Sequence, residues 1–265
     1  MDHLVFLKLG GSLITDKDRP HTHRPEVLAR LAAEIAAARA ASPDLRLLIG
    51  HGSGSFGHTA AHKYDTRHGV RDAAGWLGFA EVWREARALN QIVVEALLRA
   101  GLPVVAFPPS AFILTRDGLA AACDSAGIEA ALRGGLLPLV NGDVVFDSLR
   151  GGAILSTEDV FSALAPALRP ARILLAGLEE GVFADFPTCR TLIPHITPDT
   201  FRQISAGVSG SASADVTGGM REKVELMLRL VRHAPALEAC IFSGRQNGLV
   251  QSALLGAAPG TRITI

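Results

Sequence analysis

Short apolar runs alternate with longer stretches of helical period along most of this 265-residue chain. The runs end in Gly, Pro, His or Asn, which is typical of strands buried on both faces of a parallel sheet. Five such runs lie at residues 4–9, 45–49, 103–107, 136–140 and 171–176. The expected helices lie at residues 25–41, 79–100, 125–133, 158–168 and 217–233. Strand and helix in alternation predict right-handed βαβ crossovers, and so an α/β fold with a mostly parallel sheet.

The last part of the chain continues this pattern. Residues 239–243 and 261–264 are expected to be strands, with a short helix after Asn247 between them. Asp215 or Thr217 is the expected cap of the helix at 217–233. No repeat, low-complexity tract or linker interrupts the sequence, so we predict one domain, with any division into lobes near Ala171.

Composition excludes several classes of partner. Hydrophobic residues make up 48% of the chain, and 26 basic residues balance 26 acidic ones without a Lys/Arg block. We therefore expect no nucleic-acid partner and no membrane partner. Cys123, Cys189 and Cys240 lie far apart, which predicts small buried side chains in a reducing, cytoplasmic environment.

Two glycine-rich turns follow the first two expected strands. Lys8 precedes the first, Gly10-Gly11-Ser12, and Lys17 follows it; the second runs from Gly50 to His58. Glycine allows several backbone N–H groups to face one anion, and ligands bind beyond the carboxyl ends of parallel strands. Two such turns beside cationic or titratable side chains predict two phosphorylated groups held face to face, as in phosphoryl transfer.

Histidines bracket the second turn. We expect His58 to bind a phosphate oxygen or transfer a proton, because an imidazole titrates near neutral pH. For His51, a catalytic role and a role in bracing the loop are about equally supported.

Polar residues also follow two later expected strands. Gly142 lies in an Asn-Gly-Asp segment, and Thr157 and Asp159 precede an apolar helical stretch. Asp159 has two interpretations: a first-turn carboxylate with Ser156 as the cap, or a group that orients the lysines or a magnesium ion. We favour the second.

A further turn before a helix spans residues 215–223. Asp215, Gly218 and Gly219 precede Lys223, an arrangement that predicts a clamp on the β- and γ-phosphates of ATP. Neither the P-loop pattern nor the protein-kinase signatures occur in the chain.

Together these motifs resemble the amino acid kinase superfamily and, within it, the isopentenyl phosphate kinases, over nearly the whole chain. The resemblance implies an open αβα sandwich, usually dimeric, that transfers the γ-phosphoryl group of ATP to isopentenyl phosphate in isoprenoid biosynthesis. It implies an acceptor lobe at about residues 1–170 and a nucleotide lobe at about 171–265. ATP with Mg²⁺ is the expected cofactor pair, with magnesium bound mainly through phosphates and no protein metal site.

The motifs and the resemblance together assign roles to residues. The catalytic set is Lys8, Lys17, His58, Asp159 and Lys223. The acceptor would contact Gly52, Ser53, Gly54, His58, Gly142 and Thr157. The nucleotide would contact Lys8, Gly10, Gly11, Ser12, Gly54, Asp215, Gly218, Gly219 and Lys223.

Two segments depart from the family pattern. The second turn reads Gly-Ser-Gly at 52–54, where three glycines are common, and Glu179-Glu180 stands where the family has an aspartate-containing segment near the adenosine. Phe79, Val82 and Trp83 are candidates to surround the hydrocarbon tail of the acceptor, although ordinary helix packing would place such side chains there too.

Three other functions remain open. A phosphonate kinase of the fosfomycin-resistance type would use the same histidine, and a carboxylate kinase would not need it. A nucleotide-binding sensor or storage protein would keep the fold without the chemistry.

Overall fold

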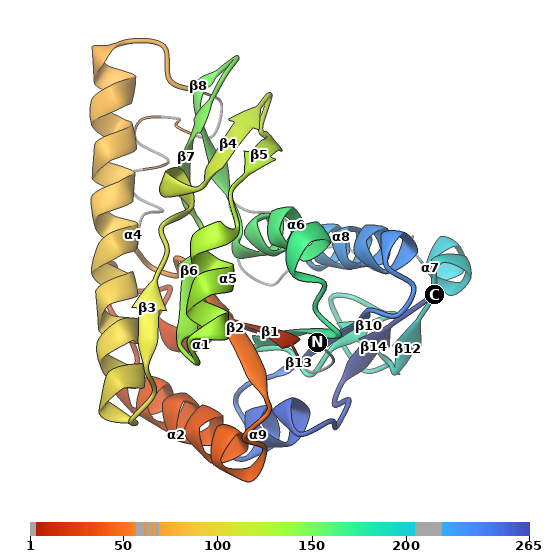
Figure 1. Cartoon of the computed structure of the whole chain (residues 1–265). Helices are drawn as coiled ribbons and strands as arrows, with labels where there is room; N and C mark the ends of the chain where they lie inside the picture. Colours follow the sequence, from red (N-terminus) through yellow and green to blue (C-terminus); the bar gives the residue numbers. More distant parts are fainter. Residues whose placement is uncertain (1–3, 57–60, 62–63, 65, 67–68, 205–218) are drawn as a thin grey trace.

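An eight-stranded sheet forms the centre of the molecule, in the order β12-β14-β13-β9-β1-β2-β6-β3 (Figure 1). This computed structural model describes residues 4–56, 61, 64, 66, 69–204 and 219–265. Every neighbouring pair in the sheet is parallel except β13 and β14. Its strands are β1 (Leu4–Leu9), β2 (Arg46–His51), β3 (Val104–Ala106), β6 (Leu137–Asn141), β9 (Arg172–Gly177), β12 (His195–Ile196), β13 (Glu238–Ser243) and β14 (Thr261–Ile263).

Helices cover both faces of this sheet (Figure 1). Successive side chains of β1 point to opposite faces, so Phe6 packs with Phe161 of one helical layer and Leu7 lies in the cluster that contains Leu31 of the other. One layer is α5 (Ala126–Arg133), α6 (Thr157–Leu168) and α8 (Met220–His233). The other is α1 (Gly11–Ile14), α2 (Pro25–Ala41), α4 (Ala73–Arg99) and α9 (Leu249–Leu254). The expected αβα sandwich is confirmed.

A second, four-stranded sheet stands above the first, in the order β5-β4-β7-β8 (Figure 1). Its strands are β4 (Ile113–Arg116), β5 (Leu119–Cys123), β7 (Asp143–Asp147) and β8 (Gly151–Leu155). The carboxylate of Asp147 accepts hydrogen bonds from Thr115 Oγ1 at 2.8 Å and from the backbone nitrogen of Gly118 at 2.7 Å. These bonds fasten the turn between β4 and β5 to β7. The local sequence patterns did not predict this sheet.

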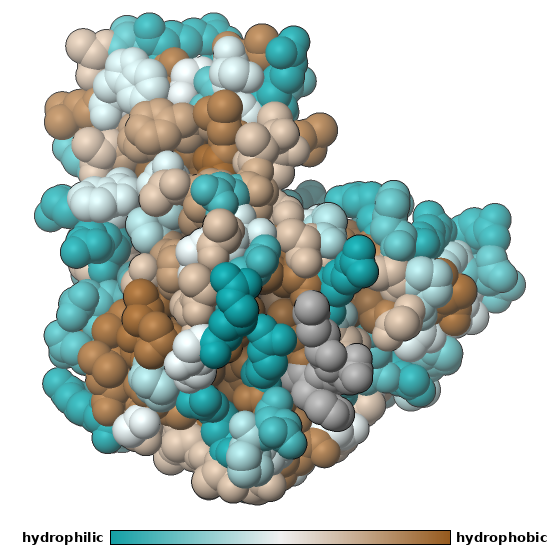
Figure 2. Space-filling view, viewed as in Figure 1, coloured by the Kyte–Doolittle hydropathy of each residue, from teal (hydrophilic) through white to brown (hydrophobic). Residues whose placement is uncertain are grey.

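The small sheet presents apolar side chains to solvent. Leu114, Leu119 and Phe146 are exposed, and Figure 2 shows hydrophobic residues gathered on this upper part of the molecule. The other elements in the described part of the chain are η2 (Pro109–Ala111), β10 (Val182–Phe183), β11 (Leu192–Ile193) and α7 (Pro198–Ile204).

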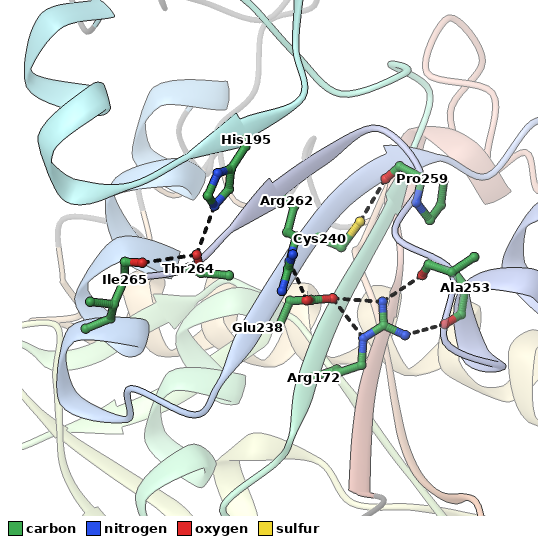
Figure 3. Close-up of polar contacts among 10 residues, drawn as sticks. Arg172, His195, Glu238, Cys240, Ala253, Pro259, Arg262, Thr264 and Ile265 are labelled. Atoms are coloured by element: carbon green, nitrogen blue, oxygen red, sulfur yellow. Dashed lines mark hydrogen bonds and ion pairs between the residues drawn. The ribbon is translucent and has the colours of Figure 1, made fainter.

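The carboxyl-terminal strands are joined by a partly buried charge network (Figure 3). Arg172 on β9 donates to Glu238 on β13 at 3.1 Å and to the carbonyl of Ala253 at 2.6 Å, and Arg262 on β14 also donates to Glu238. Strand β9 follows directly after Ala171 and pairs with β1 on one side and β13 on the other, so the sheet continues without a break across the position where two lobes could meet.

Several boundaries differ from the sequence predictions. Helix α4 begins at Ala73, because Asp72 caps it by accepting from the backbone nitrogen of Gly75 at 2.8 Å. Helix α8 begins at Met220, and the expected caps Asp215 and Thr217 lie outside the described residues.

The prediction of three buried cysteines is right only for Cys240. Cys123 and Cys189 are partly exposed, since they lie at the end of an edge strand and in a loop. Within the described part of the chain, no helix is both long and apolar enough to cross a membrane.

Candidate active site

The candidate site lies where the parallel strands end. In the register of the sheet, Leu9 of β1 pairs with His51 of β2 and Ala176 of β9, and His51 pairs with Asn141 of β6. The turns that follow β1, β2 and β6 therefore leave the sheet at the same edge. This is the position at which open α/β sheets bind ligands.

The two glycine turns touch through their backbones. A Cβ on Gly52 would lie 2.8 Å from the backbone nitrogen of Gly11, and one on Gly11 would overlap the backbone of Gly54. Gly54 has a φ of +55°, and its turn is held by Thr15, whose Oγ1 accepts from the backbone nitrogen of Ser55 at 2.9 Å. The predicted face-to-face arrangement is thus a direct contact that larger residues would block.

A helix dipole adds little to anion binding by the N–H groups of the first turn. Helix α1 has only four residues, and the backbone nitrogen of Gly10 is used by a 2.8 Å hydrogen bond to the carbonyl of Ala176. We conclude that Gly10 shapes the turn.

Lys8 is buried and forms an ion pair with Glu158 of α6. Burial would raise the pKa of the Glu158 carboxyl, but the charges of Lys8 and Lys223 and the hydrogen bond from Lys8 lower it below its ordinary value. Glu158 Oε1 has no hydrogen-bond partner among the described residues. An ionised Glu158 keeps Lys8 charged and fixed at the end of β1.

Asp159 does not have the predicted contact with the lysines. Its carboxylate accepts from the backbone nitrogen and hydroxyl of Ser156, at 2.9 and 2.6 Å, and Ser156 Oγ accepts from the backbone nitrogen of Asp159. This capping box uses Asp159 to close the start of α6. The residue before it, Glu158, faces the lysines instead.

One cavity joins the glycine turns to the strand ends. Its polar wall contains three lysines and the N-terminus of α6. Among the predicted residues, this wall includes Lys8, Gly11, Ser12, Lys17, Gly52, Ser53, Gly54, Gly142, Thr157 and Lys223. Thr157 Oγ1 also donates to the carbonyl of His51 at 2.7 Å, which fixes the start of α6 against β2.

The cavity also has an apolar part. Val82 and Ala86 of α4, Ile154 and Leu155 of β8, and Ala61 line this part. Val82 was predicted for the tail. Phe79 lies outside the described lining and stacks on Phe146, with ring centroids 5.1 Å apart. Trp83 also lies outside it, with the guanidinium of Arg87 5.6 Å from its ring centroid.

Asp143 lines the same cavity and was not among the predicted site residues. Burial raises the pKa of its carboxyl to about 7, although it accepts hydrogen bonds from the backbone of Val144 at 2.7 Å and from Asn141 at 3.4 Å. A carboxyl that is protonated near neutral pH repels a neighbouring anion less than an ionised carboxylate does.

His58, Asp215 and Gly218 lie outside the described residues, and Gly219 precedes α8 without lining the described cavity. The described residues include no group of three or more His, Cys, Asp or Glu side chains that could hold a metal ion.

The cavity combines three lysine side chains, two backbone turns and an apolar part. It can therefore bind a phosphate-bearing molecule with a hydrocarbon part beside a second anion. The sequence profile of the amino acid kinase family matches residues 3–243. The chain belongs to the amino acid kinase family.

Within that family it belongs with the isopentenyl phosphate kinases. It is 33% identical to the isopentenyl phosphate kinase of Methanocaldococcus jannaschii, with 98% of each chain covered. It is 34% identical to that of Methanothermobacter thermautotrophicus, with 98% of this chain and 99% of the relative covered. A crystal structure of an isopentenyl phosphate kinase superposes with a TM-score of 0.84 at 31% identity, covering 99% of this chain and all of that one. The resemblance inferred from the motifs is confirmed.

Proposed function

We propose that this protein transfers the γ-phosphoryl group of ATP to isopentenyl phosphate, forming isopentenyl diphosphate and ADP. The observation that supports this most is the single cavity, in which three lysines and two glycine turns adjoin an apolar pocket. A phosphate monoester with a short hydrocarbon tail matches both parts.

In this proposal an oxygen of the acceptor phosphate attacks the γ-phosphorus of ATP. The new P–O bond forms as the bond from that phosphorus to the β–γ bridging oxygen breaks, and the electron pair leaves with ADP. Charge spread over the transferring oxygens is the feature that catalysis must stabilise. Lys8, Lys17 and Lys223 supply that stabilisation from the cavity wall.

The two substrates would approach from the two turns. Gly11, Ser12, Lys223 and the segment with Asp215, Gly218 and Gly219 would hold the nucleotide. Gly52, Ser53, Gly54, Gly142 and Thr157 would hold the acceptor phosphate together with His58. The direct contact of Gly11 with Gly54 supports this assignment, because it brings the two anion sites against each other.

Magnesium would arrive with ATP. The described residues offer no protein cage for it, so the phosphates would hold the ion, and bound there it would neutralise developing charge.

Three further features of the protein are proposed. We infer a homodimer, because β3 forms one edge of the large sheet and Val105 on it is exposed, as are the nearby Leu98 and Leu136. The free cysteines are compatible with a reducing cytoplasm. We also retain the division into acceptor and nucleotide lobes near Ala171.

An assay of ADP release tests the proposed acceptor. MgATP would be offered with isopentenyl phosphate, dimethylallyl phosphate, fosfomycin, glutamate and acetylglutamate. We expect isopentenyl phosphate to give the highest kcat/KM and dimethylallyl phosphate the next. Preference for fosfomycin would identify a phosphonate kinase, preference for an amino acid a carboxylate kinase, and no stimulation at all a nucleotide-binding protein.

A further inference from the structure

A chain of buried polar side chains lies directly behind the cavity wall. His51, at the end of β2, has no solvent exposure. Its Nδ1 lies 3.1 Å from the carbonyl oxygen of Gly52, and its Nε2 lies 3.0 Å from Nδ2 of Asn90 on α4. The same Asn90 nitrogen lies 3.4 Å from Oδ1 of Asn141 on β6.

The partners at each end determine where the hydrogens lie. A carbonyl oxygen only accepts, so Nδ1 of His51 must carry the hydrogen that bonds to Gly52. In a neutral ring Nε2 is then an acceptor, and Asn90 donates to it. The second hydrogen of Asn90 is directed at Asn141 Oδ1. The amide of Asn141 in turn donates to Gly142 O at 3.2 Å and to Asp143 Oδ2 at 3.4 Å.

Only the neutral Nδ1–H form of His51 satisfies all of these contacts. Burial lowers the pKa of His51 to about 4; the hydrogen bond to Gly52 opposes this change and the nearby charge of Lys8 adds to it. The imidazole is therefore uncharged throughout the neutral range.

This chain of polar side chains connects two parts of the cavity wall. Gly52 at one end and Gly142 and Asp143 at the other line the cavity, whereas His51, Asn90 and Asn141 lie outside its described lining. The backbone of His51 adds to this connection, because its carbonyl accepts from the nitrogen of Gly142 at 3.2 Å as well as from Thr157.

We propose that His51 and Asn90 are positioning residues for the acceptor phosphate, with His51 held as the neutral Nδ1–H tautomer. The imidazole turns the carbonyl of Gly52 into the protein, so that the turn presents N–H groups and not a carbonyl oxygen to the anion. Asn90 fixes the tautomer and ties this turn to the end of β6. The identity of the substrate in this inference rests on the proposed function, whereas the hydrogen-bond geometry of His51 and Asn90 does not.

The first test needs no variant. Nitrogen-15 NMR of histidine-labelled protein reports which imidazole nitrogen carries hydrogen, and loss of one signal in His51→Asn would assign the resonance. We expect a neutral, Nδ1-protonated ring that does not titrate between pH 5.5 and pH 8.5. A Nε2-protonated ring, or an imidazolium at pH 7, would overturn the proposal.

The second test is Asn90→Asp, which replaces the donor with an acceptor of the same size. His51 would then have to move its hydrogen to Nε2 or bind a second proton, and we expect its NMR signals to report that change. The KM for isopentenyl phosphate should rise about tenfold while the KM for ATP changes much less. Gln91→Glu makes the same chemical change on the exposed face of α4 and should behave as the wild type.

Conservative replacement separates positioning from simple packing. The amide of His51→Asn can still donate to the carbonyl of Gly52, whereas the side chain of His51→Leu cannot. We therefore expect the KM for isopentenyl phosphate to be lower in His51→Asn than in His51→Leu. Equal increases in both KM values in Asn90→Asp, or unchanged kinetics in that variant, would contradict the proposal. A wild type that ignores isopentenyl phosphate would contradict the proposed function, but the tautomer measurement would stand.

Discussion

Lys8 and Glu158 form an ion pair inside the protein, although 150 positions separate them in the sequence. The pair joins the central strand β1 to the start of α6 at the edge where the turns converge. Glu158→Gln would remove the carboxylate charge beside the buried Lys8 ammonium, so we expect a loss of about 3 kcal/mol in unfolding free energy. We expect kcat to fall by about a hundredfold, because Lys8 loses its fixed position.

The matched comparison is Asp159→Asn. This variant weakens a helix cap, so it should cost about 1 kcal/mol of stability with a smaller effect on kcat. Urea denaturation and steady-state kinetics measure both quantities. If Asp159→Asn lost more activity than Glu158→Gln, the assignment of Glu158 as the lysine partner would be wrong.

The contact between the glycine turns predicts a strong effect of a single methyl group. Gly54→Ala would place its Cβ against Thr15 in a backbone conformation that alanine rarely adopts. We expect a loss of about 1–3 kcal/mol in unfolding free energy and a large loss of activity. Gly134→Ala at the end of α5 has only ordinary contacts at 3.5 Å, and it should change neither quantity appreciably. Equal behaviour of the two variants would show that the turns do not need their close approach.

Val82 should influence which hydrocarbon tail is accepted. Val82→Ala enlarges the apolar part of the cavity, so we expect the ratio of kcat/KM for geranyl phosphate over isopentenyl phosphate to rise about tenfold. Val93→Ala removes the same atoms from a buried position of α4 that lies outside the described lining. It should lower stability and leave the ratio unchanged, and a shift of the ratio in both variants would argue against Val82 as a tail contact.

Asp143 predicts a particular dependence of stability on pH. Burial raises the pKa of its carboxyl from the ordinary 3.8 to about 7, so the group stays protonated in the folded protein up to about that pH. The stability that this protonated carboxyl adds to the folded protein is fully present below its ordinary pKa of 3.8 and is lost as the pH rises through about 7. Asp143→Asn should therefore compare more favourably with the wild type at pH 8.5 than at pH 5 in urea denaturation. The same difference in unfolding free energy at both pH values would contradict the raised pKa.

The parallel core could be predicted from the sequence because its signal is local. Continuous apolar runs such as residues 4–9 mark strands covered on both faces, and the helical periods between them indicate the crossovers. The strands of the small sheet gave no such signal. Residues 119–123 are mostly alanine, and four of the five are exposed, so neither alternation nor burial marks them as a strand.

The candidate site, too, could be predicted only in part from the sequence. Glycine turns and strand-end lysines stand out in the sequence, and the structure brings Lys8, Lys17 and Lys223 to one cavity. The choice between Glu158 and Asp159 depended on the direction of each side chain. The spacing from Ser156 to Asp159 already fits a capping box and could have indicated that Glu158 faces inward. The roles of Asn90 and Asp143 arise from contacts between distant segments, which no local pattern shows.

Product analysis decides whether phosphoryl transfer to isopentenyl phosphate is the reaction of this protein. Phosphorus-31 NMR of a mixture of protein, MgATP and isopentenyl phosphate should show the monoester resonance replaced by the two coupled resonances of a diphosphate ester, in step with ADP formation. The signals should be absent when His58→Ala replaces the wild type at equal concentration. ADP accompanied by free phosphate, with the isopentenyl phosphate signal unchanged, would contradict the proposed function.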